Sequence, residues 1–253
     1  MKHLLQSFFI AFSMYSKIPM PRTDWTKDAM KYSMCFFPLV GGVIGLLMMA
    51  WYTLFYGKIG ELFFTAVAVL IPVLVTGGIH LDGMLDTADA LSSYKSREEK
   101  LEILKDSHAG AFAIIVGICY FVAYFGVYSE VTPETVPVLS LGFLLSRIYS
   151  ALAVVSFPLA KNTGLVHTFS DMSLKKTVRI VMAVGLLVVT ACLLFVDWVY
   201  GLGASVAAAL TFLYYYRMSG KKFGGITGDL AGFFVQICEL MMALVVVVIS
   251  MIR

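Results

Sequence analysis

Residues 34–56 read MCFFPLVGGVIGLLMMAWYTLFY, a run of 23 residues that contains no Asp, Glu, Lys or Arg. A helix needs about 20 predominantly apolar residues to cross the hydrocarbon core of a bilayer. Six further stretches of similar character follow, at 62–80, 110–129, 136–157, 178–197, 200–217 and 231–252. Because helices pair their own backbone groups in lipid, we expect an all-α integral membrane protein with about seven transmembrane helices. The spacing of Gly41 and Gly45 predicts a close helix contact.

The composition of the whole chain agrees with this interpretation. Hydrophobic residues make up 60% of its 253 residues and charged residues 14%, and the mean hydropathy is +0.87. An ordinary soluble domain contains about 45–50% apolar and about 25% charged residues, so lipid must cover part of this apolar surface. The net charge of +3 is too small to indicate a nucleic acid partner. The four cysteines lie in separate apolar stretches, without the spacing of a zinc site or a disulfide framework.

The amino-terminal stretch 4–15 is apolar but too short to cross a bilayer of about 30 Å. No signal-peptide cleavage site follows it, and Lys17-Ile18-Pro19-Met20-Pro21 interrupts the pattern. We therefore expect a retained short helix that is interfacial or re-entrant. No repeat or change of composition divides the remaining chain, so residues 1–253 are expected to form a single polytopic membrane domain.

The basic residues orient the spans. Lys and Arg concentrate in the segments 17–31, 81–109, 158–179 and 217–230, whereas the connections between them contain only Lys58. Cytoplasmic loops of membrane proteins carry an excess of Lys and Arg. Strict alternation of the spans then places all four basic segments and the N-terminus in the cytoplasm, and the C-terminus outside.

The segment at about 80–110 is the longest polar one, and it contains an acidic cluster. Asp82, Asp86 and Asp89 follow the spacing i, i+4, i+7, which puts their carboxylates on one face of a helix. Their mutual repulsion is costly near a low-dielectric region unless a cation binds, and oxygen ligands suit Mg²⁺. We expect a Mg²⁺ site here, with Asp106 as the candidate for a fourth carboxylate. A solvated first helical turn, the alternative, would explain only one of the three acids.

Two charges and two histidines add candidates for the same chemistry. Arg147 and Glu239 interrupt apolar spans, and a charge at that depth usually faces a polar cavity. We expect both to contact substrate or the metal site, with an internal salt bridge between them as the alternative. His80 and His108 are the nearest candidates for a general base, because a neutral imidazole accepts a proton near pH 7. A metal-bound carboxylate could do the same, and the histidines would then be polar boundary residues.

Motifs along most of the chain resemble the cobalamin synthase (adenosylcobinamide-GDP ribazoletransferase) family. They are Ile18-Pro19-Met20-Pro21, Phe37-Pro38-Leu39-Val40-Gly41, His80-Leu81-Asp82-Gly83, Asp86-Thr87-Ala88-Asp89-Ala90, Asp106-Ser107-His108-Ala109-Gly110-Ala111 and Gly225-Ile226-Thr227-Gly228-Asp229. The acidic motif is the most specific of these. Two positions depart from the family pattern: Lys17 stands where Arg is expected, and Phe233 where a small residue is expected.

The resemblance implies a Mg²⁺-dependent transferase in the bacterial cytoplasmic (inner) membrane, with its active site facing the cytoplasm. It would join α-ribazole, or its 5′-phosphate, to adenosylcobinamide-GDP and release GMP, giving adenosylcobalamin or its 5′-phosphate. The implied catalytic residues are Asp82, Asp86, Asp89, His80 and His108. The partners are these two substrates and the lipid bilayer, and a homo-oligomer or an association with other cobalamin-pathway enzymes stays open.

A diphosphate substrate needs cations and backbone amides in addition to a metal. The segment 221–229 is rich in glycine and precedes an expected helix, whose first amides could hold a phosphate, although it lacks the ending of a P-loop. The expected substrate contacts are Lys17, Arg22, Lys105, Arg147, Lys161, Lys222, Thr227, Asp229 and Glu239. For the basic residues in loops, the positive-inside rule is the alternative explanation.

Two other functions remain open at this point. CDP-alcohol phosphotransferases also combine an Asp-rich membrane site with a nucleotide leaving group, but the Ala-Arg that follows their Asp-Gly pair is missing after Asp82-Gly83. A transporter would suit the intramembrane charges of Arg147 and Glu239. Against it, the chain has no internal repeat and its acids concentrate at one membrane face instead of the midplane.

Overall fold

A computed structural model describes residues 2–106 and 108–253, and in this part of the chain the secondary structure is helical apart from one isolated bridge between Leu159 and Ile226. Six helices are long and apolar enough to cross a membrane. They are α3 (Ser33–Phe55), α7 (Ala111–Ser129), α8 (Val136–Ser156), α10 (Lys175–Val196), α11 (Trp198–Phe223) and α12 (Gly228–Ile252). The predicted all-α membrane fold is confirmed.

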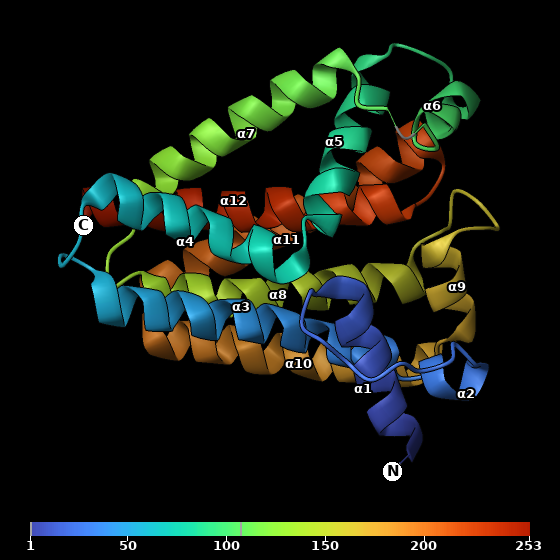
Figure 1. The fold of residues 1–253 in the computed structure, drawn as a ribbon, viewed down its shortest axis with the longest axis horizontal. Helices are drawn as coiled ribbons and strands as arrows, with labels where there is room; N and C mark the ends of the chain where they lie inside the picture. The colour runs from blue at the N-terminus through green and yellow to red at the C-terminus, as the bar shows by residue number, and fades with distance from the viewer. Residues whose placement is uncertain (1, 107) are drawn as a thin grey trace.

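The expected span 62–80 is bent instead of straight. It consists of α4 (Glu61–Thr76) and α5 (Ile79–Ser92), whose axes differ by 94°. Gly77 and Gly78 separate them, with φ values of +65° and +79° that a residue with a side chain adopts only under strain. Figure 1 shows α5 running across the direction of the long helices, so we treat α4 as the spanning part and α5 as lying outside the spans.

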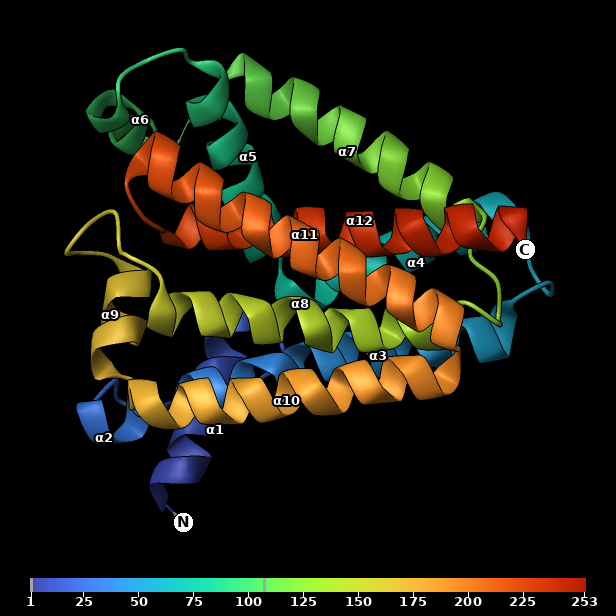
Figure 2. The same ribbon diagram turned by 180° about the vertical axis from the view of Figure 1, so that it is seen from behind.

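Four shorter helices complete the described chain: α1 (Lys2–Tyr15), α2 (Lys27–Met30), α6 (Arg97–Ile103) and α9 (Leu165–Met172). Both ribbon views place them at the same end of the long helices (Figures 1 and 2). The amino-terminal helix has 14 residues, in keeping with the prediction of a short helix that does not span. The hydroxyl of Ser7 ties it to α2 by donating to the carbonyl oxygen of Ala29 at 2.6 Å.

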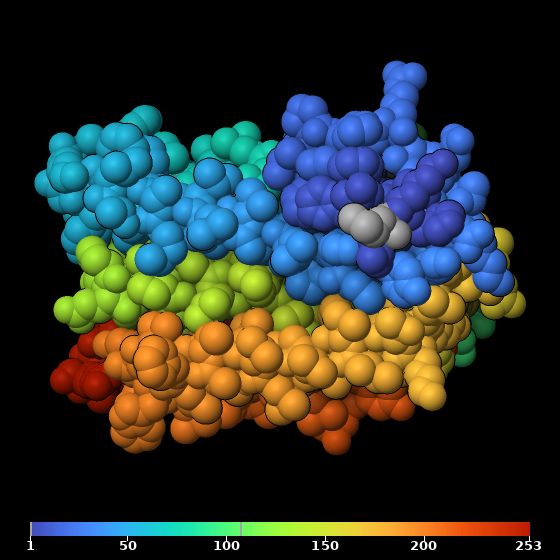
Figure 3. All heavy atoms as spheres, turned by 90° about the horizontal axis from the view of Figure 1, so that it is seen from below, coloured from blue at the N-terminus to red at the C-terminus, as the bar shows by residue number. Residues whose placement is uncertain are grey.

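Helix α8 is the centre of the bundle, because α3, α10, α11 and α12 all pack on it. A β carbon on Gly41 would lie 2.1 Å from the carbonyl oxygen of Phe143, and one on Gly45 would lie 2.5 Å from that of Ser140. The two glycines therefore let α3 approach α8 closely, as their spacing predicts. The view from below shows α8 between α3 and α10 (Figure 3). Helix α10 exposes Ile180, Leu187 and other apolar side chains on its outer face, where lipid would cover them.

The connections of the bundle differ in charge between its two ends. The segments 17–31, 81–109, 158–179 and 217–230, which hold most of the Lys and Arg, lie at the end that carries α1, α2, α6 and α9. The connections at the other end lie near the C-terminus (Figure 1) and contain Lys58 as their basic residue. The polar chemistry of the chain is thus gathered at one end of the helices.

Candidate functional site

Helix α5 carries three carboxylates on one face, and the start of α12 adds a fourth. Asp82, Asp86 and Asp89 are partly or fully exposed, while Met84, Thr87 and Ala88 on the other face are buried. Asp229 lies in the first turn of α12. The acidic cluster, by which we mean these four aspartates, is therefore built from two segments far apart in the sequence.

Two glycines bring α5 and α12 together. A β carbon on Gly83 would lie 2.8 Å from the α carbon of Asp229, and one on Gly232 would lie 2.8 Å from the carbonyl oxygen of His80. Any side chain at these positions would force the helices apart. The contact places Asp229 directly beside the acidic face of α5.

Electrostatics show that the acids are close enough to influence one another. Partial burial, and then the negative charges of Asp82, Asp229 and Asp89, raise the pKa of Asp86 to about 6. Such a shift marks a carboxylate that lacks a compensating cation. Among the described residues, no three His, Cys, Asp or Glu side chains already close around a metal position. The oxygen-only donor set nevertheless fits Mg²⁺, which usually takes one or two carboxylates and completes its shell with water and substrate phosphate.

Asp89 has a structural contact of its own. Its carboxylate accepts hydrogen bonds from the backbone amides of Gly110 at 2.6 Å and Ala113 at 2.9 Å. It thereby caps the N-terminus of α7, where amides lack helical partners. Asp89 thus fixes α7 to α5. Within the described part of the chain, Asp82, Asp86 and Asp229 form no such backbone cap at a neighbouring helix.

A cleft of about 350 Å³ opens beside Asp229, and we call it the polar cleft because two lysines line it. Lys105, Lys161 and His167 line it together with Thr227 and the first residues of α9 and α12. Partial burial and the positive charge of Lys105 lower the pKa of Lys161, so two like charges face one cavity. Two cations and two helix N-termini around one cleft make it suitable for an anion such as a diphosphate. Of the expected substrate contacts, Lys105, Lys161, Thr227 and Asp229 meet here.

An apolar cavity of about 270 Å³ adjoins this cleft and shares Leu165, Val166, Gly228 and Asp229 with it. His80 lines the apolar cavity and is 5% exposed. Burial, and then the charge of Arg147, lower the pKa of His80 to about 3. The imidazole is therefore neutral near pH 7 and a weak base, and its expected role as general base stays a prediction.

The other expected site residues lie elsewhere. Arg147 and Glu239 are buried in the bundle and form an ion pair with each other, so the salt bridge that was the alternative is the arrangement found. Asp106 is exposed and accepts a hydrogen bond from His108 at 2.7 Å, and its role as a fourth carboxylate of a metal site stays a prediction. The acid from outside α5 whose charge acts on Asp86 is Asp229. Lys17, Arg22 and Lys222 are exposed and line neither cavity.

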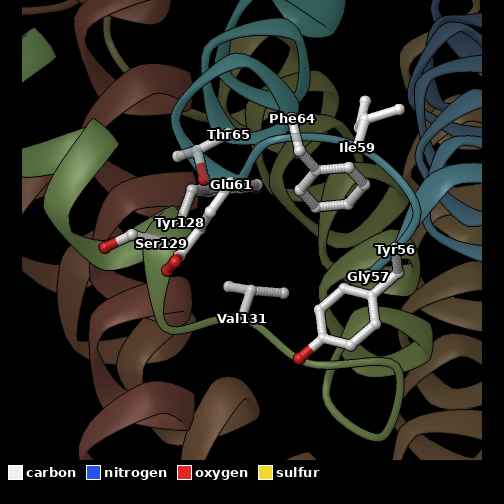
Figure 4. Close-up of a pocket in the computed structure, with 9 residues that line it drawn as sticks. All are labelled: Tyr56, Gly57, Ile59, Glu61, Phe64, Thr65, Tyr128, Ser129 and Val131. Atoms are coloured by element: carbon white, nitrogen blue, oxygen red, sulfur yellow. The ribbon is translucent and has the colours of Figure 1, made fainter.

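A further cavity of about 290 Å³ lies at the opposite end of the helices (Figure 4). Its walls come from the end of α3, the start of α4 and the end of α7, and they include Tyr56, Glu61, Thr65 and Tyr128. None of the expected site residues lines it. We assign it no part in the chemistry of the acidic cluster.

The sequence interpretation missed the contribution of α9 and of two aromatic residues. Leu165 and Val166 of α9 form the wall between the polar cleft and the apolar cavity, yet the distribution of Lys and Arg indicates only a basic loop here. Val166 and Phe169 are buried at the spacing i, i+3, a signal that could have indicated an inward-facing helix. Tyr15 and Phe37, which also line the apolar cavity, lie in apolar stretches where nothing distinguishes them from core residues.

Fold and site together define a class of protein: a multi-pass helical membrane protein with an acid-rich, lysine-flanked site at one end of its helices. The family model described as cobalamin-5-phosphate synthase matches residues 7–247. The chain belongs to this family.

Curated relatives of similar length carry one common name, adenosylcobinamide-GDP ribazoletransferase. The protein from Lachnoclostridium phytofermentans is 44% identical over 96% of this chain and 94% of its own length. Those from Clostridium botulinum (strain Alaska E43) and Desulfitobacterium hafniense are each 31% identical, over 95% of this chain and 96% of their own length. No solved structure matches the chain.

Proposed function

We propose that this protein is a membrane transferase that joins α-ribazole, or its 5′-phosphate, to adenosylcobinamide-GDP and releases GMP. The observation that carries the proposal is the junction of the acidic cluster with a cleft lined by Lys105 and Lys161. Phosphoryl transfer consists largely of positioning and charge neutralisation, which this junction supplies. Membership of the family, whose curated members bear the name of this activity, supports the same reaction.

The reaction breaks a phosphoric anhydride bond and forms a phosphodiester. A hydroxyl oxygen of the ribazole forms a bond to the phosphorus that carries the cobinamide, and the bond from this phosphorus to the bridging oxygen breaks. GMP leaves with that oxygen, and the hydroxyl proton passes to a base or to water. The product is adenosylcobalamin or its 5′-phosphate.

We assign the diphosphate of the donor to the polar cleft. Lys105 and Lys161 would neutralise its non-bridging oxygens, and the amides of Gly228 and Asp229 at the start of α12 would donate to them. Asp82, Asp86 and Asp229 would hold Mg²⁺ at the edge of the cleft. The ion would neutralise the charge that develops on the phosphate oxygens.

The decisive experiment uses the purified full chain in detergent with adenosylcobinamide-GDP, α-ribazole and Mg²⁺. GMP release that requires all three, and that Asp86→Ala abolishes while the protein stays folded, is the expected result. The absence of GMP release by the wild-type protein, with both substrates shown to bind, would contradict the proposed reaction.

We further propose that the site faces the cytoplasm from the bacterial cytoplasmic membrane. The basic connections lie at the same end as the acidic cluster, and basic loops remain on the cytoplasmic side. Alkaline phosphatase fused after Arg253 should be active and a fluorescent protein fused there should not fluoresce; the reverse result would contradict the orientation. A homo-oligomer, or an association with other enzymes of the pathway, stays a prediction.

The two alternatives are less well supported. Asp229 lies in the first turn of α12 and Gly83 of α5 packs against it, so the acids gather at one end of this helix, whereas a transporter binds its substrate near the midplane. The charges that would have suited a transport path, Arg147 and Glu239, neutralise each other. A CDP-alcohol phosphotransferase would share the acid-rich site but not the family to which this chain belongs.

A further inference from the structure

The apolar cavity is enclosed by parts of six helices. Met14 and Tyr15 come from α1, Met34 and Phe37 from α3, Ser150 and Val154 from α8, and Val166 from α9, with α5 and α12 closing the remaining sides. Its volume is about 270 Å³, just below the roughly 300–1,000 Å³ that is typical of small-molecule sites, so it suits a small ligand or one part of a larger one. Asp82 and Asp229 lie in its wall, so one edge of the cavity is the acidic cluster itself.

Flat side chains form a large part of this wall. The rings of Tyr15 and His80 are nearly parallel, with an interplanar angle of 6° and centroids 5.9 Å apart. Phe37 lies close to both, with centroids 4.3 Å from Tyr15 and 5.7 Å from His80. A planar aromatic ligand gains both apolar burial and favourable ring contacts on such a surface.

The imidazole of His80 is a polar group that lacks a partner in the described structure. Neither ring nitrogen has a hydrogen-bond partner, although the residue is 5% exposed. A buried polar group without a partner is costly, and such groups are rare in folded proteins. Because His80 lines the cavity, a ligand with one nitrogen or oxygen in an otherwise apolar body would satisfy it.

The parts of the two substrates differ in how well they meet these conditions. Guanine has several donors and acceptors on its edges. Asp82 and Asp229 could accept from its N–H groups only at the edge that borders the acidic cluster, and the apolar side chains that form most of the remaining wall would leave its other polar groups unpaired. The corrin ring is far larger than a cavity of about 270 Å³. A lipid acyl chain would fit the apolar walls but would leave His80 unpaired. The base of α-ribazole, a benzimidazole, is planar and apolar and has one unsubstituted ring nitrogen.

We propose that this cavity binds the benzimidazole base of the ribazole acceptor, with the His80 N–H donating to the free ring nitrogen of the base. This assignment rests on the proposed function and adds where the acceptor binds and which residue recognises it. A base held here directs its ribose toward Asp82 and Asp229, where the hydroxyl meets the diphosphate in the adjoining cleft. Acceptor and donor then occupy two different cavities that share the wall formed by Leu165 and Val166.

The first test fills the cavity. In Val154→Phe the added ring occupies part of the cavity, so the Kd for α-ribazole, measured by equilibrium dialysis without donor, should rise about tenfold or more. The KM for adenosylcobinamide-GDP should stay within about twofold of the wild-type value. The matched control is Val131→Phe, which lines the cavity at the opposite end (Figure 4) and should change neither constant.

The second test keeps the shape of the cavity and removes the hydrogen bond. The wild-type protein should bind the indole analogue of the riboside, in which carbon replaces the free nitrogen, about tenfold more weakly than α-ribazole. His80→Phe should bind the two ligands equally. This comparison of two ligands within one variant remains informative even if Val154→Phe fails to fold.

The outcomes separate this assignment from the reaction itself. In one outcome, wild type releases GMP, Val154→Phe binds α-ribazole as wild type does, and His80→Phe still binds α-ribazole more tightly than the indole analogue. This result would overturn the cavity assignment and leave the reaction standing. If Val154→Phe raises the KM for adenosylcobinamide-GDP and leaves the Kd for α-ribazole unchanged, the cavity binds guanine and the assignment is overturned. Tight α-ribazole binding that both variants weaken, without GMP release by wild type, would support the cavity assignment and contradict the proposed reaction.

Discussion

The α carbon of Asp229 lies 2.8 Å from the position that a β carbon on Gly83 would occupy. The distance is too short for two carbon atoms that are not bonded, so α5 and α12 can touch here only because residue 83 is glycine. This contact brings a carboxylate from the end of the sequence into the acidic face of α5. It is the packing detail on which the geometry of the acidic cluster depends.

Gly83→Ala should therefore reduce GMP release by about a hundredfold, because a displacement of Asp229 by about 1 Å misplaces a reacting group. The measurement is kcat with saturating substrates, together with thermal unfolding in detergent. Gly42→Ala is the matched control, since a β carbon there would meet Leu144 at an ordinary 3.9 Å. Equal activity of the two variants would contradict the importance of the Gly83 contact.

Removal of one charge from the acidic cluster should weaken the binding of Mg²⁺ and lower the activity. Asp86→Asn keeps the size of the side chain but loses a ligand charge, and kcat should fall by about a hundredfold or more. The check is a titration of activity against Mg²⁺ concentration, with EDTA removing the wild-type activity. Asp28→Asn, at an exposed acid of α2, should leave the titration unchanged. Wild-type activity that persists in EDTA would disprove the metal assignment.

Lys161→Gln should weaken binding of the donor substrate. The charge of Lys161 faces the polar cleft together with that of Lys105, and loss of one charge-assisted contact to a phosphate corresponds to about a tenfold to hundredfold higher KM. Steady-state kinetics with adenosylcobinamide-GDP and with α-ribazole should show the change for the former only. Lys176→Gln, in an exposed lysine at the start of α10, serves as control; an equal effect there would point to general surface charge.

The ion pair of Arg147 and Glu239 predicts an effect on stability that is separate from chemistry. Glu239→Leu leaves the guanidinium of Arg147 buried without its partner, which costs about 3–5 kcal/mol in the free energy of unfolding. The double variant Arg147→Met/Glu239→Leu should recover most of this loss. Thermal or denaturant unfolding in detergent of the wild type, the single variants Arg147→Met and Glu239→Leu and the double variant measures the coupling energy between the two residues. If the double variant is as unstable as the sum of the single ones, the two residues do not act as a pair.

Much of the fold could be predicted from local properties of the sequence. Span length, hydropathy and the distribution of Lys and Arg are properties of consecutive residues, and they predicted the long helices and the end at which the polar segments lie. The spacing of Asp82, Asp86 and Asp89 likewise predicted a shared face, because helical periodicity is local. The bend after α4 was missed, since Gly77-Gly78 reads equally as a flexible point within a span and as the left-handed turn that the structure has.

The sequence by itself determined that this protein is a helical membrane protein with a row of carboxylates at one edge. Only the tertiary structure decided that Asp229 joins these acids, that Arg147 and Glu239 pair with each other, and that α9 separates two cavities. The physical reason is that these relationships depend on which helices approach closely, and the approach is set by pairs such as Gly83 and Asp229. Contacts of this kind involve residues from distant parts of the chain, so no pattern within one segment reveals them.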